Sequence, residues 1–286
     1  MLGLSMLAVA PVSLAAYGLS APAIAPIWAV DASTSLRSDG FAVLPAEARI
    51  ASHLVEEAKA ETTLRLDVLL NAIGSIGIET VEQHYSFSEI NHRARLRWDL
   101  RMPDSSEAFH MLCEHAFEQA TPVLQELTGC EQPRLVMSGA VVSRPGASAQ
   151  HVHTDGDERG LFTIFVPLVD IEAESDGTSF LAGSHLETDV LARTAKSDEG
   201  VMEFDAETMT RMISPACVAG GLLCFDYRTA HRGRANAGRE RAVAYIVVST
   251  EEGVTDDSNF DTMSVLHDLR HPDMPAHMAE TVWDWE

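Results

Sequence analysis

The chain has 286 residues, of which 46% are hydrophobic and 22% are charged, and its formal net charge is -23. This composition supplies enough apolar side chains for a sizeable core and excludes a chain that is disordered throughout. The acidic balance argues against a nucleic-acid partner, because a strongly negative surface repels phosphate backbones and anionic lipid headgroups. Lys59 and Lys196 are the only lysines, so arginine carries most of the positive charge.

The first thirty residues stand apart because none of them is charged, and Asp31 is the first charged residue. The stretch is long enough to span a bilayer, but prolines interrupt it and no basic residue precedes it. A cleaved signal or membrane anchor, an organelle-targeting segment and a tail without a targeting role all stay open, as does a cytoplasmic or organellar location. We set residues 1–30 apart from the fold, expect folded sequence from about Ser35, and treat residues 31–286 as a single domain.

The first half of the folded part predicts helices. Residues 39–45 indicate a turn and a short strand, and residues 46–71 are rich in Ala, Leu and Glu. Apolar residues recur there at helical spacing: Ile50, Leu54, Leu64 and Val68. The pattern predicts a helix that ends near Gly74 and buries these positions.

A second helix is expected over residues 105–127, with Ser105 or Ser106 as N-cap and Gly129 as its end. Between the two helices, residues 95–101 alternate charged and bulky apolar side chains, which predicts a strand. Its arginines, Arg95, Arg97 and Arg101, either line the mouth of a pocket or pair with carboxylates. The excess of acidic residues favours pairing.

After Gly129 the chain becomes rich in short β-forming runs separated by Gly, Pro, Asp and Ser. We expect strands at residues 135–143, 149–154, 161–168, 178–181, 222–225 and 242–248. Helices followed by many short strands indicate an α+β fold in which the helices support one face of a jelly roll. The four cysteines, at 113, 130, 217 and 224, form no C-x-x-C pair and are expected to be buried, reduced thiols.

The stretch that carries chemistry is Gln150-His151-Val152-His153-Thr154-Asp155-Gly156. Residues two apart in a strand point to the same face, so His153 and Asp155 would aim an imidazole and a carboxylate at one point. A third ligand is supplied by His231, at the end of the strand that follows Gly220 and Gly221. Two histidines and one carboxylate form the facial triad of non-haem Fe(II) oxygenases and leave three coordination positions open.

A dicarboxylic co-substrate needs a cation, and a guanidinium binds a carboxylate through two hydrogen bonds. No lysine follows His231, so an arginine must supply the charge. Arg241 opens the last strand after a short loop and is the residue we choose. Arg239 shares its strand face by parity but lies nearer the loop, and Arg232, Arg234 and Arg270 are the other arginines in this part of the chain.

Four segments in order resemble the phytanoyl-CoA dioxygenase family of Fe(II)/2-oxoglutarate oxygenases, over roughly residues 35–260. Pro145-Gly146-Ala147 with Gln150, His153, Asp155 and Gly156 resembles its metal-binding strand. Residues 176–185 resemble its "GpT-flpGSH" segment, with Ala182 where proline is frequent, and residues 220–231 resemble the strand that brings in the distal histidine. Asn236 and Arg241 resemble its asparagine and its oxoglutarate-binding arginine.

The resemblance implies a double-stranded β-helix core, iron ligands His153, Asp155 and His231, and Arg241 as the anchor of 2-oxoglutarate, with Thr178 as a further contact. It implies a 2-oxoglutarate-dependent dioxygenase that uses Fe(II) and O2 to hydroxylate a small-molecule or lipid substrate and releases succinate and CO2. Related halogenases have a small residue in place of the carboxylate, so Asp155 favours hydroxylation. The negative charge argues against a CoA thioester, and membrane contact is expected only through residues 1–30. The oligomeric state stays open.

An alternative metal site uses His151, which shares a face with His153 by parity. With Glu158 and His231 it would give three histidines and a glutamate, similar to cupins on the same type of barrel. This alternative, a cupin-like enzyme or ligand-binding module, leaves Asp155 and Arg241 without a role. His185, in Gly-Ser-His, is interpreted as a turn or helix-cap residue rather than a ligand.

Overall fold

The computed structural model describes residues 25–175, 177–198 and 200–256. Its helices are α1 (Ile27–Asp39), α2 (Ser52–Ser75), α3 (Glu107–Thr128) and α4 (Ala206–Thr210), with 3-10 turns at Ala46–Ala48, Ser184–Leu186 and Val190–Arg193. Its strands are β1 (Phe41–Val43), β2 (Ser86–Phe87), β3 (Ile90–Ala94), β4 (Arg97–Leu100), β5 (Arg134–Ser143), β6 (Leu161–Pro167), β7 (Thr178–Phe180), β8 (Ala195–Lys196), β9 (Met202–Glu203), β10 (Leu223–Asp226), β11 (His231–Gly233) and β12 (Arg241–Ser249).

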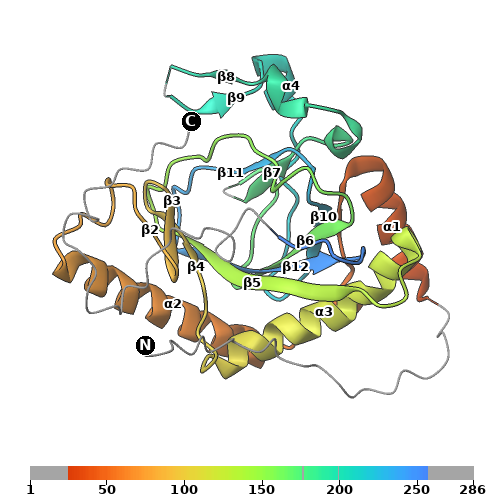
Figure 1. Ribbon diagram of the computed structural model, residues 1–286, viewed down its shortest axis with the longest axis horizontal. Helices are drawn as coiled ribbons and strands as arrows, with labels where there is room; N and C mark the ends of the chain where they lie inside the picture. The colour runs from red at the N-terminus through yellow and green to blue at the C-terminus, as the bar shows by residue number, and fades with distance from the viewer. Residues whose placement is uncertain (1–24, 176, 199, 257–286) are drawn as a thin grey trace, which may run out of the picture.

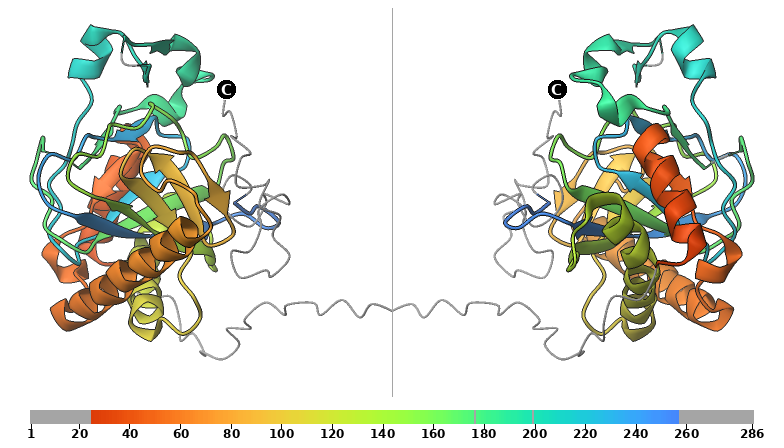
Figure 2. Two further views of the ribbon diagram at one scale, coloured as in Figure 1. Left: turned by 90° about the vertical axis from the view of Figure 1, so that its left-hand side faces the viewer. Right: turned by 90° about the vertical axis from the view of Figure 1, so that its right-hand side faces the viewer.

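The fold is a jelly roll supported by helices, as the sequence predicted. Eight antiparallel strands form one sheet in the order β1-β10-β6-β12-β5-β4-β3-β2, and β7 pairs with β11 in a small second sheet. The small sheet lies above the large one in Figure 1, and β8, β9 and α4 lie above the small sheet. Figure 2 shows α2 and α3 on the opposite side, so the large sheet separates these two helices from the small sheet.

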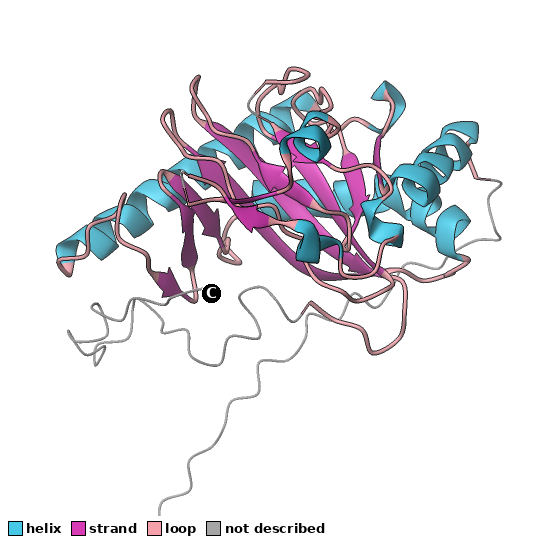
Figure 3. Ribbon diagram, turned by 90° about the horizontal axis from the view of Figure 1, so that it is seen from above, coloured by secondary structure: helices cyan, strands magenta, loops and turns pink. Residues whose placement is uncertain are grey.

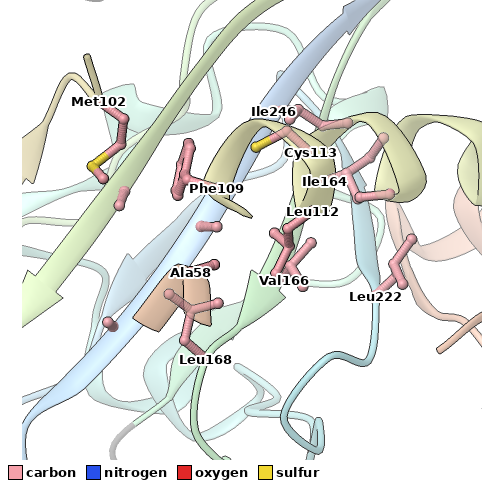
Figure 4. Close-up of a cluster of buried hydrophobic side chains, with 14 of the residues drawn as sticks. Ala58, Met102, Phe109, Leu112, Cys113, Ile164, Val166, Leu168, Leu222 and Ile246 are labelled. Carbon is pink, nitrogen blue, oxygen red and sulfur yellow. The ribbon is translucent and has the colours of Figure 1, made fainter. Parts of the chain in front are cut away.

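The alternation of side chains along the long strands decides what each face of the large sheet contacts. On β12, Ala242, Ala244, Ile246 and Val248 are buried in the cluster that the helices cover. Phe109 and Leu112 of α3, and Ile164 and Val166 of β6, belong to the same cluster, as Figure 4 shows. The side chains of the residues that alternate with these along β12 point the other way, toward the small sheet. One sheet therefore supplies both a dry core and the floor of a cavity.

The two predicted helices are present as α2 and α3, in the predicted order, but they differ in detail, and α1 and α4 were not predicted. The stretch 46–71 divides into a 3-10 turn and α2, and the predicted apolar face was wrong for Leu64 and Val68, which are 65% and 52% exposed. The buried stripe of α2 runs instead through Val55, Ala58, Thr62, Leu66, Leu69 and Ile73, at an unbroken helical spacing. Figure 3 shows the two long helices behind the strands of the large sheet.

The start of α3 shows why its predicted cap was incomplete. Ser106 is the N-cap residue, but its side chain makes no capping hydrogen bond. The Glu61 carboxylate of α2 accepts hydrogen bonds from the backbone N–H groups of Ala108 and Phe109 instead, at 3.3 and 2.9 Å. A long-range acceptor satisfies the helix terminus and ties α2 to α3. The end at Gly129 is as predicted, with φ 75° and its N–H bonded to the carbonyl of Gln125.

Three further features differ from the expectations. The folded part begins earlier than Ser35, because α1 starts at Ile27 and buries Ala29 completely. Residues 149–154 form no regular strand, since His153 makes only an isolated bridge to His231. The strands β2 and β3 were not anticipated. Residues 1–24 and 257–286, which include most of the apolar segment and Arg270, lie outside the described residues.

No helix in the described part of the chain combines the length and the apolar character that crossing a bilayer requires. All four cysteines are free thiols, and Cys113, Cys217 and Cys224 are buried as expected, whereas Cys130 is partly exposed. Burial raises the pKa of the Cys217 thiol to about 12, so this thiol stays protonated at neutral pH.

Candidate metal centre

The structure brings His153, Asp155 and His231 together at the edge of the small sheet. One ligand atom from each lies within 4.8 Å of the other two, and within the described ranges this is the one group of three or more such residues. The two imidazole centroids are 4.4 Å apart, and His231 Nε2 lies 3.5 Å from Asp155 Oδ1. Residues from two distant stretches therefore converge closely enough to share one ion.

Main-chain hydrogen bonds hold these residues in register. The backbone N–H of His153 donates to the carbonyl of His231 at 2.9 Å, and the reverse bond is 2.8 Å. Asp155 is held separately, because its N–H donates to the carbonyl of Tyr227 at 3.0 Å. In place of the strand predicted at residues 149–154, the structure has a segment whose backbone hydrogen bonds at His153 and Asp155 attach it to the segment that contains His231.

Both imidazoles are oriented by carbonyl groups of their own segments. His153 Nδ1 lies 2.8 Å from the carbonyl oxygen of His151, and His231 Nδ1 lies 2.9 Å from that of Thr229. A carbonyl oxygen only accepts hydrogen bonds, so each Nδ1 carries the proton and each Nε2 is the lone-pair atom. In metal-ligating histidines, the ring nitrogen that does not bind the metal usually donates a hydrogen bond of this kind.

The electrostatics of the three side chains suit a divalent cation. Burial lowers the pKa of His153 to about 3, and the neighbouring His231 acts in the same direction, so the His153 imidazole is neutral as a ligand must be. Burial raises the pKa of Asp155, while His231 and a 2.7 Å hydrogen bond from Thr163 oppose the rise. A bound cation would offset the cost of keeping this carboxylate charged.

The Gly-Ser-His segment after β7 supports His231 rather than the ion. Ser184 Oγ accepts a 2.8 Å hydrogen bond from the N–H of Ala230, which precedes His231. His185 is buried and its Nε2 lies 3.3 Å from the carbonyl of Arg37, at the end of α1. The segment thus ties α1 to the strand that carries His231.

A cavity of about 380 Å³ adjoins the three residues and is lined by both sheets. Arg241, 5% exposed, lines it together with Thr178 of β7. Arg241 pairs in register with Ser143 of β5, which pairs in turn with Arg97 of β4. Cross-strand partners project to the same face, so both guanidinium groups belong to the cavity side of the sheet.

Sequence reasoning missed Arg93 as a residue of this cavity and left the role of Arg97 open between the pocket mouth and a carboxylate partner. Arg97 is 2% exposed, lines the cavity and donates to the carbonyls of Ser148 and Arg234 at 3.2 and 2.6 Å. Arg95 does pair with a carboxylate, that of Glu82, at 2.7 Å. Parity along β4 was the available signal, because it places Arg97 opposite the buried Trp98.

A buried polar cluster on β3, β4 and β12 forms another wall of the cavity. Both Arg93 Nε and Nη2 donate to Asp99 Oδ2, at 3.1 and 2.8 Å, and Tyr245 donates to Asp99 Oδ1 at 3.0 Å. Burial raises the pKa of the Tyr245 hydroxyl well above its ordinary value, so it stays a donor. Gly139 lies between these strands, and a Cβ there would be 2.5 Å from the Tyr245 hydroxyl oxygen.

Other residues of the predicted motifs lie nearby in supporting roles. Asn236 is 1% exposed and donates to the carbonyls of Ser143 and Arg239, at 2.9 and 2.8 Å, which holds the loop before β12. His151 and Glu158 are absent from the group of potential ligands formed by the described residues. His151 Nδ1 accepts a 2.7 Å hydrogen bond from the N–H of Met202. The set of three histidines and a glutamate is therefore not assembled.

Solved structures with the same fold include two bacterial proteins and an enzyme of nogalamycin biosynthesis. AviO1 from Streptomyces viridochromogenes Tue57 aligns with a TM-score of 0.55 and 16% identity, over 82% of this chain and 98% of that one. EvdO2 from Micromonospora carbonacea var. aurantiaca, solved with 2-oxoglutarate, aligns with a TM-score of 0.51 and 18% identity, over 77% of this chain and 90% of that one. The epimerase SnoN, solved with Fe3+, α-ketoglutarate and nogalamycin RO, aligns with a TM-score of 0.50 and 18% identity, over 77% of this chain and 83% of that one.

At these identities the structural likeness establishes the fold. No curated protein matches the chain. The family model described as phytanoyl-CoA dioxygenase (PhyH) matches residues 38–243, a range that contains His153, Asp155, His231 and Arg241. Since that match extends over most of the chain, the protein belongs to the phytanoyl-CoA dioxygenase (PhyH) family.

Proposed function

We propose that this protein is a 2-oxoglutarate-dependent dioxygenase that uses Fe(II) and O2 to hydroxylate a small-molecule or lipid substrate. The observation that carries the proposal is the convergence of His153, Asp155 and His231 within 4.8 Å, beside a cavity that Arg241 lines. Two imidazoles and one carboxylate are the donor set that selects Fe(II) in oxygenases. The family membership and the iron and 2-oxoglutarate in related structures support the same reading.

In this proposal His153, Asp155 and His231 hold Fe(II) through Nε2, Oδ1 and Nε2. The carbonyls of His151 and Thr229 keep both imidazoles in the required tautomer, and Thr163 orients the carboxylate. When bound, Fe(II) supplies the coordination positions at which O2 and the keto-acid end of 2-oxoglutarate react. Asp155 would take the coordination position that a halide needs, which favours hydroxylation over halogenation.

Arg241 is proposed to bind the distal carboxylate of 2-oxoglutarate, with Thr178 as a further contact from the opposite sheet. A buried guanidinium has little freedom and meets a carboxylate with two hydrogen bonds. The cavity volume of about 380 Å³ is at the small end of the range for ligand sites, which suits a small molecule or one end of a lipid. One oxygen atom of O2 would enter succinate and the other the substrate, with release of CO2.

The proposal is tested by succinate formation in the presence of Fe(II), 2-oxoglutarate and O2, with pools of metabolites as substrate. We expect succinate to rise above the rate without substrate, and Asp155→Ala to abolish it. With 18O2, a hydroxylated product gains one labelled oxygen atom. A product that is isomerised without label would point to an epimerase-type outcome, and no succinate from folded, iron-loaded protein in any pool would contradict the proposal.

A further inference from the structure

The described residues of the segment 187–213, which are 187–198 and 200–213, contact both stretches that carry the proposed metal ligands. It contains β8, β9 and α4, which lie above β7 and β11 in Figure 1. Two hydrogen bonds attach it to the first stretch: the N–H of Met202 donates to His151 Nδ1 at 2.7 Å, and the N–H of Val152 donates to the carbonyl of Met202 at 2.8 Å. Met202 is thus bonded through both of its backbone groups to the two residues that precede His153.

The same segment also contacts the second stretch. Glu203 forms an ion pair with Arg232, the residue after His231. An apolar cluster lies beneath these polar contacts, and it includes Val152 and Ala230, which precede His153 and His231. Phe204 and Met212 of the segment are buried against them, at 5% and 7% exposure. Residues adjacent to both imidazoles are therefore packed against residues 187–213.

His151 links these contacts to the metal centre. Its ring accepts a hydrogen bond at Nδ1 from the backbone N–H of Met202, and its carbonyl oxygen accepts one from Nδ1 of His153. Nδ1 is therefore the acceptor of the bond from Met202, because an N–H group donates only to a lone pair. Met202 holds the His151 ring, and the His151 carbonyl oxygen orients the His153 ring. Together the two contacts restrict the rotation of the His153 imidazole.

We infer that His151 is a positioning residue for the metal centre: its ring anchors the His153 loop to Met202, so that its carbonyl oxygen aims His153 Nε2 at the ion. The inference rests on the proposed metal role of His153. It assigns His151 a task that needs an acceptor at Nδ1 and no contact with the metal. A side chain that keeps an acceptor near this position should therefore replace it.

Two substitutions separate the acceptor from the bulk of the ring. His151→Asn keeps an oxygen acceptor close to the place of Nδ1, whereas His151→Leu keeps similar bulk without one. The probe is Co(II), titrated at neutral pH and followed by its visible absorption, whose shape reports ligand geometry. We expect His151→Leu to weaken Co(II) binding about threefold to tenfold and to alter the band, as loss of one supporting hydrogen bond allows. His151→Asn should stay within about twofold of the wild type.

Two further measurements make the result specific. Glu158→Gln, an exposed residue on the same loop, is the matched control and should leave Co(II) affinity unchanged. Hydrogen exchange at the Met202 amide should become faster in His151→Leu but not in His151→Asn. Unchanged Co(II) affinity in the Leu variant, or equal weakening in both variants, overturns the role of His151. Absence of Co(II) binding by the wild type contradicts the proposed metal centre itself, so the two failures are distinguishable.

Discussion

His153 and His231 exchange backbone hydrogen bonds with each other, at 2.9 and 2.8 Å, and their imidazole centroids are 4.4 Å apart. The main chain therefore sets the spacing of the two rings, and the side chains add only their orientation. A substitution at either side chain leaves both backbone bonds in place. Changes to the metal centre should consequently affect metal binding more than folding, which makes the site accessible to mutagenesis.

Thr163→Val should weaken metal binding without unfolding the protein. The substitution removes the hydroxyl that donates to Asp155 Oδ2 at 2.7 Å and keeps nearly the same shape. Loss of a hydrogen bond that orients a ligand typically reduces metal affinity about tenfold to a hundredfold. Co(II) titration measures the effect, and Thr163→Ser, which keeps the hydroxyl, should bind like the wild type. Equal affinities in all three proteins would show that Thr163 does not orient the carboxylate.

Arg241→Lys should raise the KM for 2-oxoglutarate by about tenfold or more, because a lysine cannot form the two parallel hydrogen bonds of a guanidinium. Metal affinity should stay unchanged. Arg239→Lys is the control: Arg239 has the same parity, but its Nη2 donates to the carbonyl of Asp170 at 2.8 Å, away from the cavity lining. Succinate formation at varied 2-oxoglutarate measures both variants. A larger effect at Arg239 would transfer the anchoring role to that residue.

Stability should fall on acidification in part because of His92. Burial and the nearby His84 lower the pKa of His92 to about 4, against Glu79 and Glu82, which act to raise it. In the unfolded chain its pKa returns to the ordinary value, so the unfolded state binds more protons between these two values. The stability that neutral His92 contributes is fully present above the pKa that His92 has in the unfolded chain. It is lost as the pH falls toward 4, the pKa of His92 in the folded protein.

His92→Phe keeps a ring beside Tyr85 and Trp98 without a titrating group. Urea unfolding at several pH values should show a smaller loss of stability for this variant than for the wild type below neutral pH. Parallel pH profiles of the two proteins would assign the acid sensitivity to other groups.

Ile246→Ala should cost about 2–5 kcal/mol of unfolding free energy, since the side chain is fully buried between the large sheet and the helices. Leu64→Ala removes a similar side chain that is 65% exposed, and it should change stability by less than about 1 kcal/mol. Chemical denaturation measures both. Similar losses at the two positions would contradict the assignment of the α2 face.

Much of the fold was predictable from strong local patterns. The β-branched run of β12 and the apolar runs of β5, β6 and β10 gave strands at nearly the right bounds, and β6, β10 and β12 are buried on both faces. The strand β3, with the sequence INHRA, has no such pattern. In the structure Arg93 pairs with Asp99 of β4 and the His92 ring packs against Tyr85 and Trp98, and no local pattern reveals such partners.

The candidate site shows the same division. His153, Asp155 and His231 were predicted from residue types and spacing, although the expected strand at 149–154 is absent and long-range backbone bonds hold the segment instead. Arg97 was among the arginines considered for the mouth of the pocket, but Arg93 and Tyr245 could not be placed there, because their positions depend on cross-strand register. The role of His151 depends on Met202, whose backbone approaches only in the folded chain.

The most direct test of the metal centre is the visible absorption of the protein under anaerobic conditions as Fe(II) and then 2-oxoglutarate are added. A 2-oxoglutarate chelate on iron held by His153, Asp155 and His231 should give a weak metal-to-ligand charge-transfer band in the wild type and none in Asp155→Ala. A folded wild-type protein that binds iron but gives no band with saturating 2-oxoglutarate would contradict the account.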